Sequence, residues 1–469
     1  MADHVVAIVG GGITGLAAAW ALTKLDDPPA VVVFDADRLG GKLRTSPFAG
    51  LPAVDEGADA FLARVPEAIA LCNELGLGDE LVAPATGKAY LWWNGAMHRL
   101  PEGLVLGVPA GVARLASSDL LSWRGKARAA LEPLLPRRSA ALDDDNLGAL
   151  IRSRFGDEVL ERLVDPLIGG INAGDADHLS LSASAPQVAE VAARSRSLLI
   201  GLRRRALPTG RPPTGTVSSG PATPVFLTPQ RGMASLVGRL VDALGERGVE
   251  LRTAAPIERI ERHGTGWRVG TLDADAVIVA TPAHVAAVQL AAVAPRAAAL
   301  IAAIEHASVA MVTLAFDAAN VSRSLDGAGH LIPKPPQHHL TACSWASTKW
   351  AHWRRADQVV LRASLGRYGH EASALGSDDE LIARALADLT PALGLRGAPS
   401  DVRITRWDKA FPQHTPKHLD RVLAIEAALA DEAPGLVVAG AAYRGVGIPA
   451  CIRQGVVAAA TVTRHWSIP

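Results

Sequence analysis

The first part of the chain contains two uninterrupted apolar runs, Val5–Val9 and Ala30–Phe34. Apolar runs of this length, without polar alternation, are typical of parallel strands that are buried on both faces. Between the two runs lie a glycine-containing turn and an alanine-rich segment that predicts a helix. This order of strand, turn, helix and strand predicts the beginning of an α/β domain with a parallel sheet.

Two later parts of the chain return to this pattern. Residues 226–244 predict a turn followed by a helix, Asp273–Thr281 predicts an apolar strand, and Leu436–Thr463 predicts a strand, a glycine-rich turn and a helix. Shorter strands are expected at Val249–Thr253, Ile257–Arg262 and Trp267–Val269. This α/β domain is therefore expected to be discontinuous, built from three separated stretches.

The intervening segments have other patterns. Val65–Leu77 predicts an amphipathic helix, and Tyr90–Leu100 predicts a hairpin because Asn94-Gly95 lies between apolar runs. Residues 102–205 are mostly helical in pattern, with helices expected at Arg124–Ala130, Leu147–Phe155 and Asp157–Leu167. Leu207–Thr223 is rich in Pro, Gly, Ser and Thr and predicts a linker, and residues 310–425 alternate strands with helices.

Composition excludes several classes of function. With 469 residues and 49% hydrophobic content, a large core and more than one domain are expected. Lys+Arg and Asp+Glu are both 47, so global charge gives no argument for binding nucleic acid. Cys72, Cys343 and Cys451 are far apart, which supports neither a disulfide scaffold nor a thiolate metal site. We therefore expect a reducing, cytoplasmic compartment and no metal.

The sequence also gives expectations about membranes. The first strand begins at Val5, which leaves no room for a signal peptide, and no apolar stretch is long enough to span a bilayer. The basic runs Arg137-Arg138 and Arg203–Arg205 are usually solvated faces, and contact with anionic lipid or a partner enzyme is the alternative.

The glycines after the first strand carry the clearest chemical signal. Gly10, Gly12 and Gly15 have the G-x-G-x-x-G spacing, and Asp35 follows the second strand. Gly10 permits the tight turn, Gly12 lets a pyrophosphate approach the backbone, and Gly15 lets the helix pack closely on the strand. The helix N-terminus offers N–H groups and a partial positive charge to phosphates, and Asp35 is placed to accept hydrogen bonds from a ribose. These residues predict a dinucleotide.

A second glycine pair narrows the class of dinucleotide. Gly40 and Gly41 lie in the segment RLGGKLRT directly after Asp35, and Arg44 in the same segment can pair with a phosphate. A glycine pair after the ribose-binding acid resembles the flavoprotein superfamily of amine oxidases and their relatives, which hold FAD.

Over nearly its whole length the chain then resembles the protoporphyrinogen/coproporphyrinogen oxidase family. The motifs that carry the resemblance occur in the family's order, as VVAIVGGGITGLAAA, RLGGKLRT, DEGADAFLAR, GKARAALEPLLP, RFGDEVLERLVDPLIGGINAGDADHLSL, RGM, TACSWASTKW, LRASLGR, RWDKAFPQH with His418 following, and GLVVAGAAYRGVGIPACI. The first and last are shared with other flavin amine oxidase relatives. The central AGD…LSL and RW…PQH blocks are more specific to porphyrinogen oxidases.

The resemblance implies a fold and a cofactor. The expected fold is α/β, with a discontinuous Rossmann-like FAD-binding domain, a mixed-sheet substrate domain and a mostly helical domain. We expect the FAD-binding domain at 1–60, 225–285 and 431–469, the substrate domain at 61–101 and 286–430, the helical domain at 102–205 and a linker at 206–224. FAD is expected to be bound non-covalently.

The resemblance also implies a reaction. It is the six-electron oxidation of coproporphyrinogen III to coproporphyrin III in haem biosynthesis, with dioxygen as acceptor and hydrogen peroxide as product. Protoporphyrinogen IX oxidation is the alternative, and a flavin amine oxidase, a carotenoid desaturase or a non-catalytic flavoprotein are remoter ones. The resemblance leaves open whether a ferrochelatase is a partner, whether the protein contacts the membrane surface, and whether it is a monomer or a homodimer.

The cofactor-binding residues implied by the motifs fall into four groups along the chain. They are Gly10, Gly12, Ile13, Thr14, Gly15, Asp35 and Ala36; Gly40, Gly41, Lys42, Arg44, Gly57, Ala58 and Asp59; Ile257, Thr281 and Trp407; and Gly440, Gly447, Ile448 and Pro449. No catalytic side chain is assigned, because the flavin N5 is the hydride acceptor and the protein supplies orientation and electrostatics.

The substrate carries propionates, so its pocket needs a few cationic groups. Candidates for substrate contact are Arg64, Asn172, Lys349, Arg362 and Arg444, with Arg99 as a further cation. Some positions depart from the family pattern: Asp35 replaces a common Glu, Asn172 an aromatic, His414 a Tyr and Ala450 an acid. Asn172 and His414 are expected to alter the substrate cavity.

Overall fold

The computed structural model describes residues 4–111, 115–136, 143–206, 224–334 and 338–464. Contacts between Cα atoms divide the chain into two compact units. The first unit contains the described residues of Met1–Ala83, Val225–Glu305 and His418–Pro469, and the second contains those of Pro84–Pro224 and His306–Lys417. Within these residues no helix has the length and apolar character needed to cross a membrane.

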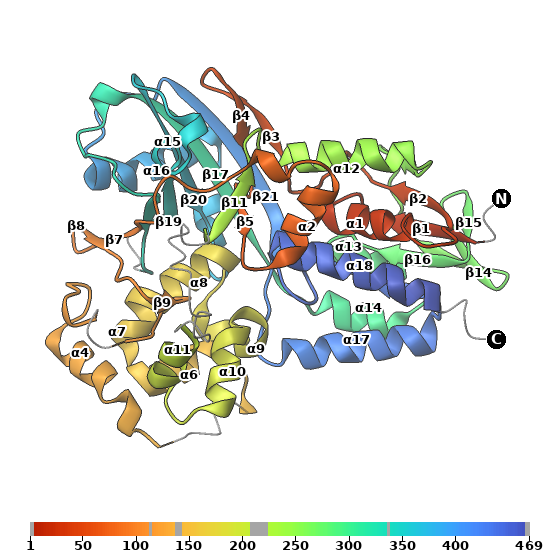
Figure 1. Ribbon diagram of the computed structural model, residues 1–469, viewed down its shortest axis with the longest axis horizontal. Coiled ribbons are helices and arrows are strands. Elements are labelled where there is room, and N and C mark those ends of the chain that lie inside the picture. Colours follow the sequence, from red (N-terminus) through yellow and green to blue (C-terminus); the bar gives the residue numbers. More distant parts are fainter. Residues whose placement is uncertain (1–3, 112–114, 137–142, 207–223, 335–337, 465–469) are drawn as a thin grey trace, which may run out of the picture. The chain divides into compact units, whose positions relative to one another are not determined.

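The first unit is built on a parallel sheet that, in the described residues, has five strands (Figure 1). Their order is β12 (Glu250–Arg252), β2 (Ala30–Phe34), β1 (Val5–Val9), β16 (Ala276–Val279) and β22 (Leu436–Val438). The predicted bounds of β1 and β2 are confirmed. Their apolar side chains alternate between two hydrophobic cores, one on each face of the sheet, which explains why the runs carry no polar residue.

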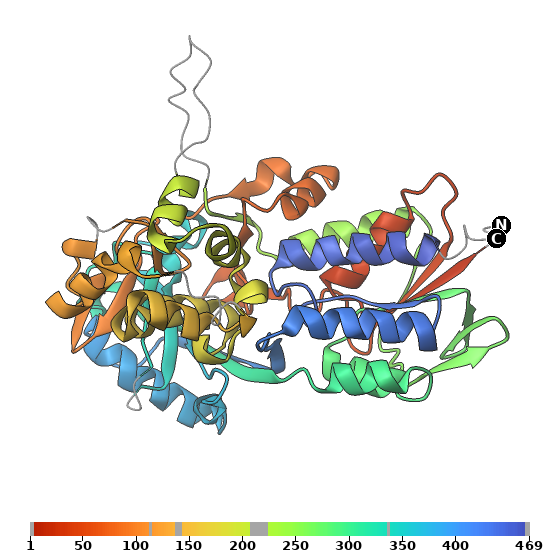
Figure 2. The same cartoon turned by 90° about the horizontal axis from the view of Figure 1, so that it is seen from below.

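Helices cover both faces of this sheet (Figures 1 and 2). One face packs on α1 (Ile13–Leu22), α2 (Pro66–Glu74), α12 (Ala234–Glu246) and α18 (Ile448–Arg464). The other packs on α13 (Ala283–Leu290), α14 (Pro295–Ala302), α17 (His418–Glu432) and the antiparallel sheet of β13 (Ile260–His263), β14 (Gly266–Val269) and β15 (Leu272–Ala274). Short strands β3 (Thr45–Phe48), β4 (Leu51–Asp55), β5 (Phe61–Leu62), β6 (Leu81–Val82) and β11 (Phe226–Pro229) complete the unit.

The second unit has a mixed sheet with seven strands in its described residues. Their order is β21 (Asp401–Pro412), β17 (His306–Asp317), β20 (Gln358–Leu365), β19 (Leu340–Trp345), β18 (Gly329–Leu331), β7 (Tyr90–Trp93) and β8 (Ala96–Arg99). β18 and β7 run parallel and the other neighbours antiparallel, and β7 and β8 form the hairpin predicted around Asn94-Gly95. α16 (Asp378–Leu393) packs on the sheet, and the short helix α15 (Ala346–Lys349) follows β19.

The predicted helical segment belongs to this second unit. Its helices are α4 (Trp123–Ala130), α6 (Leu147–Phe155), α7 (Asp157–Val159), α8 (Asp165–Asn172), α9 (Leu181–Ser184), α10 (Pro186–Arg194) and α11 (Leu198–Ala206), with the short ribbon of β9 (Leu104–Val105) and β10 (Val108–Pro109). A separate hydrophobic core lies among them. The expected linker at 206–224 falls largely outside the described residues. The mixed α/β fold class is confirmed.

Three features differ from the sequence-based expectation. The helices α2, α14 and α17, which we assigned to the substrate domain, pack on the parallel sheet of the first unit. The segment Asp273–Thr281 forms two strands rather than one, because Asp275 bonds to Val5 between β15 and β16. The strand expected at Ile257 begins at Ile260, since the Ile257 carbonyl accepts a hydrogen bond from the Gln289 side chain instead of from a strand.

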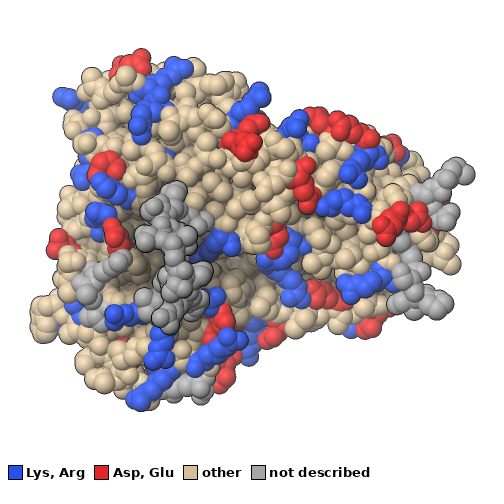
Figure 3. Space-filling view, in the orientation of Figure 1, with Lys and Arg blue, Asp and Glu red and all other residues tan. Residues whose placement is uncertain are grey.

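Charged side chains of both signs are interspersed on the face in Figure 3, as the equal numbers of acidic and basic residues lead one to expect. Among the described residues no group of three His, Cys, Asp or Glu side chains is arranged to hold a metal ion.

Candidate functional site: a glycine-lined dinucleotide cradle

The turn between β1 and α1 requires glycine at two positions. Gly10 has φ +109° and donates its N–H to the Phe34 carbonyl at 2.7 Å. A Cβ atom at Gly10 would lie 2.8 Å from the Ala280 backbone, and one at Gly15 would lie 2.0 Å from the Gly10 carbonyl oxygen. Side chains at these positions would separate the helix from the strands, so the motif's packing role follows from the geometry.

Open space lies in front of the α1 N-terminus. Gly12 is the N-cap residue, no side chain caps the helix, and a Cβ atom at Gly12 would meet nothing within 4 Å. Ile13 and Thr14 form the first turn, which contains no acidic residue. A helix N-terminus with uncapped N–H groups and space before it is suited to a phosphate.

The second glycine pair lies directly against the first turn. The Gly40 N–H donates to the Gly11 carbonyl at 2.8 Å, and Gly12 and Gly40 pair as an isolated parallel bridge. Gly41 has φ +54°, and a Cβ atom there would lie 3.3 Å from the Gly12 Cα. The two glycine motifs, distant in sequence, thus form one backbone-lined cradle.

A lysine and a carboxylate border this cradle. Burial lowers the pKa of Lys42, whose charge interacts with Cys451. Lys42 itself is exposed to solvent, directly after the Gly40-Gly41 pair. The Asp35 carboxylate accepts from the Gly11 N–H at 2.7 Å and from the Asp37 N–H at 3.0 Å, and Ala36 beside it is exposed. A carboxylate has lone pairs for further donors, such as ribose hydroxyls.

Two of the predicted cofactor residues, Thr281 and Ile257, are joined by the side chain of a glutamine that the sequence did not single out. Thr281 follows β16 beside Gly10, and its hydroxyl donates to the Gln289 side chain at 2.7 Å. The same buried amide donates to the Ile257 carbonyl at 2.7 Å. A lone glutamine on an amphipathic helix resembles a surface residue, so no sequence signal pointed to this link.

A second buried glutamine organises the C-terminal turn. The Gln454 side chain accepts from the N–H groups of Gly440 at 3.4 Å and Arg444 at 3.1 Å, and donates to the Gly445 and Ala450 carbonyls at 3.3 and 3.2 Å. The predicted residues Gly447, Ile448 and Pro449 lie at the start of α18. The turn is therefore held from within α18, and backbone is presented at its surface.

The remaining predicted cofactor residues belong neither to the glycine cradle nor to the C-terminal turn. Gly57, Ala58 and Asp59 follow β4 in an irregular segment. Arg44 is bonded to Glu56, with Nε 3.1 Å from the carboxylate, so its guanidinium already has an anionic partner. Trp407 belongs to β21 of the second unit, where it packs against a small cluster of Ala173, Ala307 and Val309.

Within each unit, the candidates for substrate contact lie on separate elements and do not form one cluster. In the second unit, Asn172 is buried at the end of α8, Arg362 is buried in β20, and Lys349 is half-buried over the Trp350 ring at 5.1 Å. In the first unit, Arg64 is exposed.

Two of the cations have acidic partners, which weakens their candidacy. Arg444 is bonded through two nitrogens to Glu426, at 2.9 and 2.7 Å. In the second unit, the exposed Arg99 is bonded to Glu102 at 2.7 Å.

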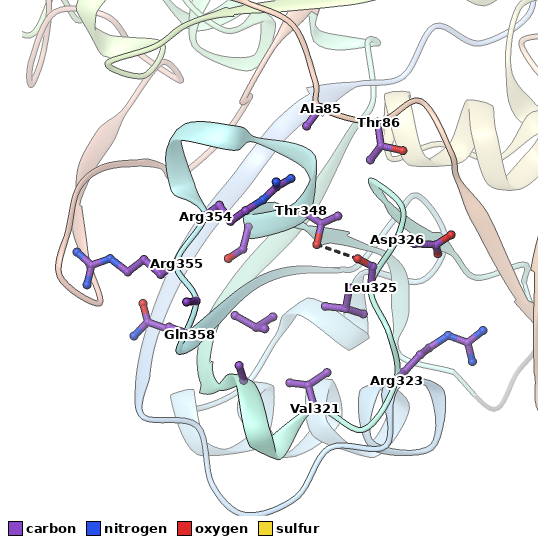
Figure 4. A pocket seen from close by; sticks show the side chains of 14 residues that line it. Ala85, Thr86, Val321, Arg323, Leu325, Asp326, Thr348, Arg354, Arg355 and Gln358 are labelled. Carbon is purple, nitrogen blue, oxygen red and sulfur yellow. Dashed lines mark hydrogen bonds between the residues drawn. The ribbon is translucent and has the colours of Figure 1, made fainter.

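The second unit also contains two cavities that these candidates do not line. The larger, about 540 Å³, lies among Ala85, Thr348 and Gln358, with Arg354 over it and with Arg323 and Arg355 pointing outward from its sides (Figure 4). The smaller, about 270 Å³, is lined by Lys334, Arg367 and three histidines at 338, 339 and 370.

Comparison with known proteins agrees with the class defined by the cradle. The family model described as flavin containing amine oxidoreductase matches residues 13–463. The chain is 36% identical to coproporphyrinogen III oxidase of Bacillus subtilis (strain 168), across 96% of both chains, and 30% identical to that of Staphylococcus aureus (strain NCTC 8325 / PS 47), across 97% of this chain and 98% of the relative. A solved structure from Exiguobacterium sp. 255-15, provisionally named a protoporphyrinogen oxidase, has a TM-score of 0.85 and 30% identity across the full length of both chains.

The chain therefore belongs to the flavin containing amine oxidoreductase family. Its cofactor is a flavin, and the glycine cradle, the helix N-terminus and Lys42 fit the diphosphate of a dinucleotide form.

Proposed function

We propose that this protein is an FAD-dependent oxidase that converts coproporphyrinogen III to coproporphyrin III, with dioxygen as acceptor and hydrogen peroxide as product. The observation that carries the proposal is the combination of the dinucleotide cradle with 30–37% identity to several coproporphyrinogen III oxidases over nearly the whole chain. FAD is bound without a covalent link. Once bound, the flavin accepts hydride equivalents at N5.

The residues of this chain supply binding and orientation. The N-terminus of α1 and Lys42 hold the diphosphate, and Asp35 holds the ribose of the adenosine half. The turn around Gly447 would contact the flavin ring, and the N-terminus of α18 would stabilise negative charge on it. Asn172 and Arg362, both buried in the second unit, are the proposed substrate contacts.

Protoporphyrinogen IX is the second candidate substrate. The chain is 29% identical to a protoporphyrinogen oxidase of Macaca fascicularis across 97% of its length, and both reactions need the same flavin chemistry. The two substrates differ in propionate number, so the arrangement of cationic groups decides between them.

A paired kinetic assay tests the proposal. FAD-bound protein is given coproporphyrinogen III and protoporphyrinogen IX in parallel, and porphyrin fluorescence and hydrogen peroxide are followed together. A kcat/KM that is much higher for coproporphyrinogen III supports the first candidate, and the reverse ratio supports the second. Oxidation of neither substrate by protein with intact FAD would contradict both.

A further inference from the structure

The turn at the end of α8 has a conformation that its sequence does not favour. Ala173 has φ +46° and ψ +37°, the left-handed region that helices usually reach with glycine at this position. Ala173 is buried, as is the preceding Asn172. Non-glycine residues keep such a conformation when the surroundings impose it, and they concentrate at functional sites.

Three successive carbonyl groups of this turn are bonded from outside the helix. The Asn172 carbonyl accepts from the Gln413 side chain at 3.2 Å, and the Ala173 carbonyl accepts from the Tyr368 N–H at 2.8 Å. The Gly174 carbonyl accepts from the Arg367 guanidinium. The last carbonyls of a helix have no partner within the helix itself, so these bonds from the segments that follow β20 and β21 fix the turn from the sheet side.

Arg367 is held in turn by a buried carboxylate. Its Nη1 and Nη2 atoms lie 3.0 and 2.8 Å from the two oxygens of Asp165, at the first residue of α8. Both side chains are about 95% buried. Asp165 also accepts from the Ala176 N–H at 3.0 Å, so one carboxylate joins the start of α8, the turn after α8 and the end of β20.

Space for the guanidinium depends on a glycine. A Cβ atom at Gly169 would lie 2.8 Å from the Arg367 Nη2 atom, so a side chain there would displace the guanidinium. Because two guanidinium nitrogens bind the two oxygens of a buried carboxylate, a lysine at 367 would keep the charge but lose this two-point contact.

The turn lies beside a residue that the sequence predicts as a cofactor contact. Trp407, a predicted cofactor contact, packs in the same small cluster as Ala173. The Asn172 amide Nδ2 donates to the Ile168 carbonyl at 3.0 Å, and within the described residues its side chain makes no other hydrogen bond. The Asn172 carboxamide oxygen therefore remains available for a ligand.

We infer that Asp165 and Arg367 are positioning residues: their ion pair fixes the left-handed turn at Asn172–Gly174 so that the Asn172 carboxamide is presented to the tetrapyrrole. This inference rests on the proposed function. It assigns no chemistry to the pair itself, which acts through Asn172.

The experiment compares two buried arginines in FAD-bound protein. Arg367→Lys breaks the fork at the turn, whereas Arg154→Lys breaks a similarly buried pair with Glu132 that holds α11 instead. Arg367→Lys is expected to lower kcat/KM for coproporphyrinogen III roughly 100-fold, as a misplaced contact group does, with FAD content unchanged. Its binding of coproporphyrin III should weaken, and the Ala176 amide should exchange hydrogen faster. Arg154→Lys should lose comparable thermal stability with kcat/KM changed by less than about threefold.

If Arg367→Lys does not fold, Gln413→Met removes one bond to the turn and should lower kcat/KM in the same direction by a smaller factor. The inference is overturned if the loss of kcat/KM in the two lysine variants is proportional to the decrease in their melting temperatures. It is also overturned if Arg367→Lys leaves hydrogen exchange at the Ala176 amide unchanged. Should the wild type oxidise neither porphyrinogen, the proposed function fails. Coproporphyrin III binding then decides the inference alone: no binding by the wild type, or equal binding by Arg367→Lys, would overturn it.

Discussion

Gly12 and Gly15 lie three residues apart in one turn, yet an added methyl group meets different surroundings at the two positions. At Gly15 it would overlap the Gly10 carbonyl, and at Gly12 it would project into the open space before α1. Gly15 is therefore needed for packing, and Gly12 for the approach of a ligand.

The substitutions Gly15→Ala and Gly12→Ala separate these roles. Gly15→Ala should lower the free energy of unfolding of the flavin-free protein by about 1–3 kcal/mol, the range for overpacking. Gly12→Ala should leave that free energy within about 0.5 kcal/mol of the wild type and weaken FAD binding at least about tenfold. Urea unfolding and FAD titration measure both quantities. Wild-type FAD affinity in Gly12→Ala would contradict the location of the cradle.

Two buried glutamines, Gln454 and Gln289, connect whole elements of the fold, because each bonds a helix to an irregular segment of backbone outside that helix. Gln454 belongs to α18 and bonds to three backbone groups of the turn before it, and to the Ala450 carbonyl within the helix. Gln289 belongs to α13 and joins Thr281 to Ile257. Buried backbone groups that lose a partner each cost about 1–3 kcal/mol.

Gln454→Leu should therefore loosen the Gly440–Gly447 turn and weaken FAD binding. Hydrogen exchange is expected to accelerate at the amides of Gly440 and Arg444, and FAD titration should show the loss of affinity. Val456→Ala, an exposed change on the same helix, serves as the control and should alter neither. Equal FAD affinity in Gln454→Leu and the control would show that the turn does not contact the cofactor.

His330 gives β18 a pH dependence that can be measured. Burial, together with the charge of Arg323, lowers the pKa of His330 to about 3, while Asp388 opposes the shift. Its Nδ1 atom accepts a hydrogen bond from the Trp345 indole at 3.1 Å, which requires the neutral ring. The unfolded chain binds a proton near pH 6.5 and the folded chain does not, so this contribution to stability is complete above that pH and is lost as pH falls toward 3.

His330→Gln should remove this dependence. Between about pH 6 and pH 4, the free energy of unfolding of the wild type should fall more steeply than that of the variant, by about 1.4 kcal/mol per pH unit. Urea unfolding at several pH values gives both slopes. Parallel curves for the two proteins would mean that His330 is protonated in the fold.

The sequence predicted best those elements whose residues all share the same burial, such as strands buried on both faces. β1 and β2 were predicted residue by residue because both of their faces are buried, and the bounds of α6 were also predicted correctly. The division between β15 and β16 was missed, since the sequence does not show that Asp275 bonds to Val5. The sheet on which α2, α14 and α17 pack was also missed, because an amphipathic face does not specify its partner.

The same reasoning applies to the sites. The glycine cradle could be predicted because each glycine has a conformational or steric reason that recurs wherever a dinucleotide meets a helix. The pairing of Asp165 with Arg367 joins residues 202 positions apart, and nothing in either local sequence indicates the other. Arg44 and Arg444 were chosen for their charge, but the structure gives both an acidic partner, Glu56 and Glu426 respectively.

At the scale of the whole molecule, the central claim is that porphyrinogen reduces the flavin held by this chain. The first unit supplies the dinucleotide cradle, and the second supplies a mixed sheet with buried polar side chains such as Asn172 and Arg362. Flavin reduction requires both functions at once and does not depend on which acceptor reoxidises the cofactor.

The most direct test is to mix the FAD-bound protein with coproporphyrinogen III in the absence of oxygen and to follow the visible absorbance of the flavin. Rapid loss of that absorbance is expected with coproporphyrinogen III, and slower loss with protoporphyrinogen IX. Because one flavin accepts two of the six electrons, porphyrin fluorescence should appear only after oxygen is admitted. A simple amine should leave the flavin oxidised. Flavin that stays oxidised with both porphyrinogens, in protein that carries a full complement of FAD, would contradict the account.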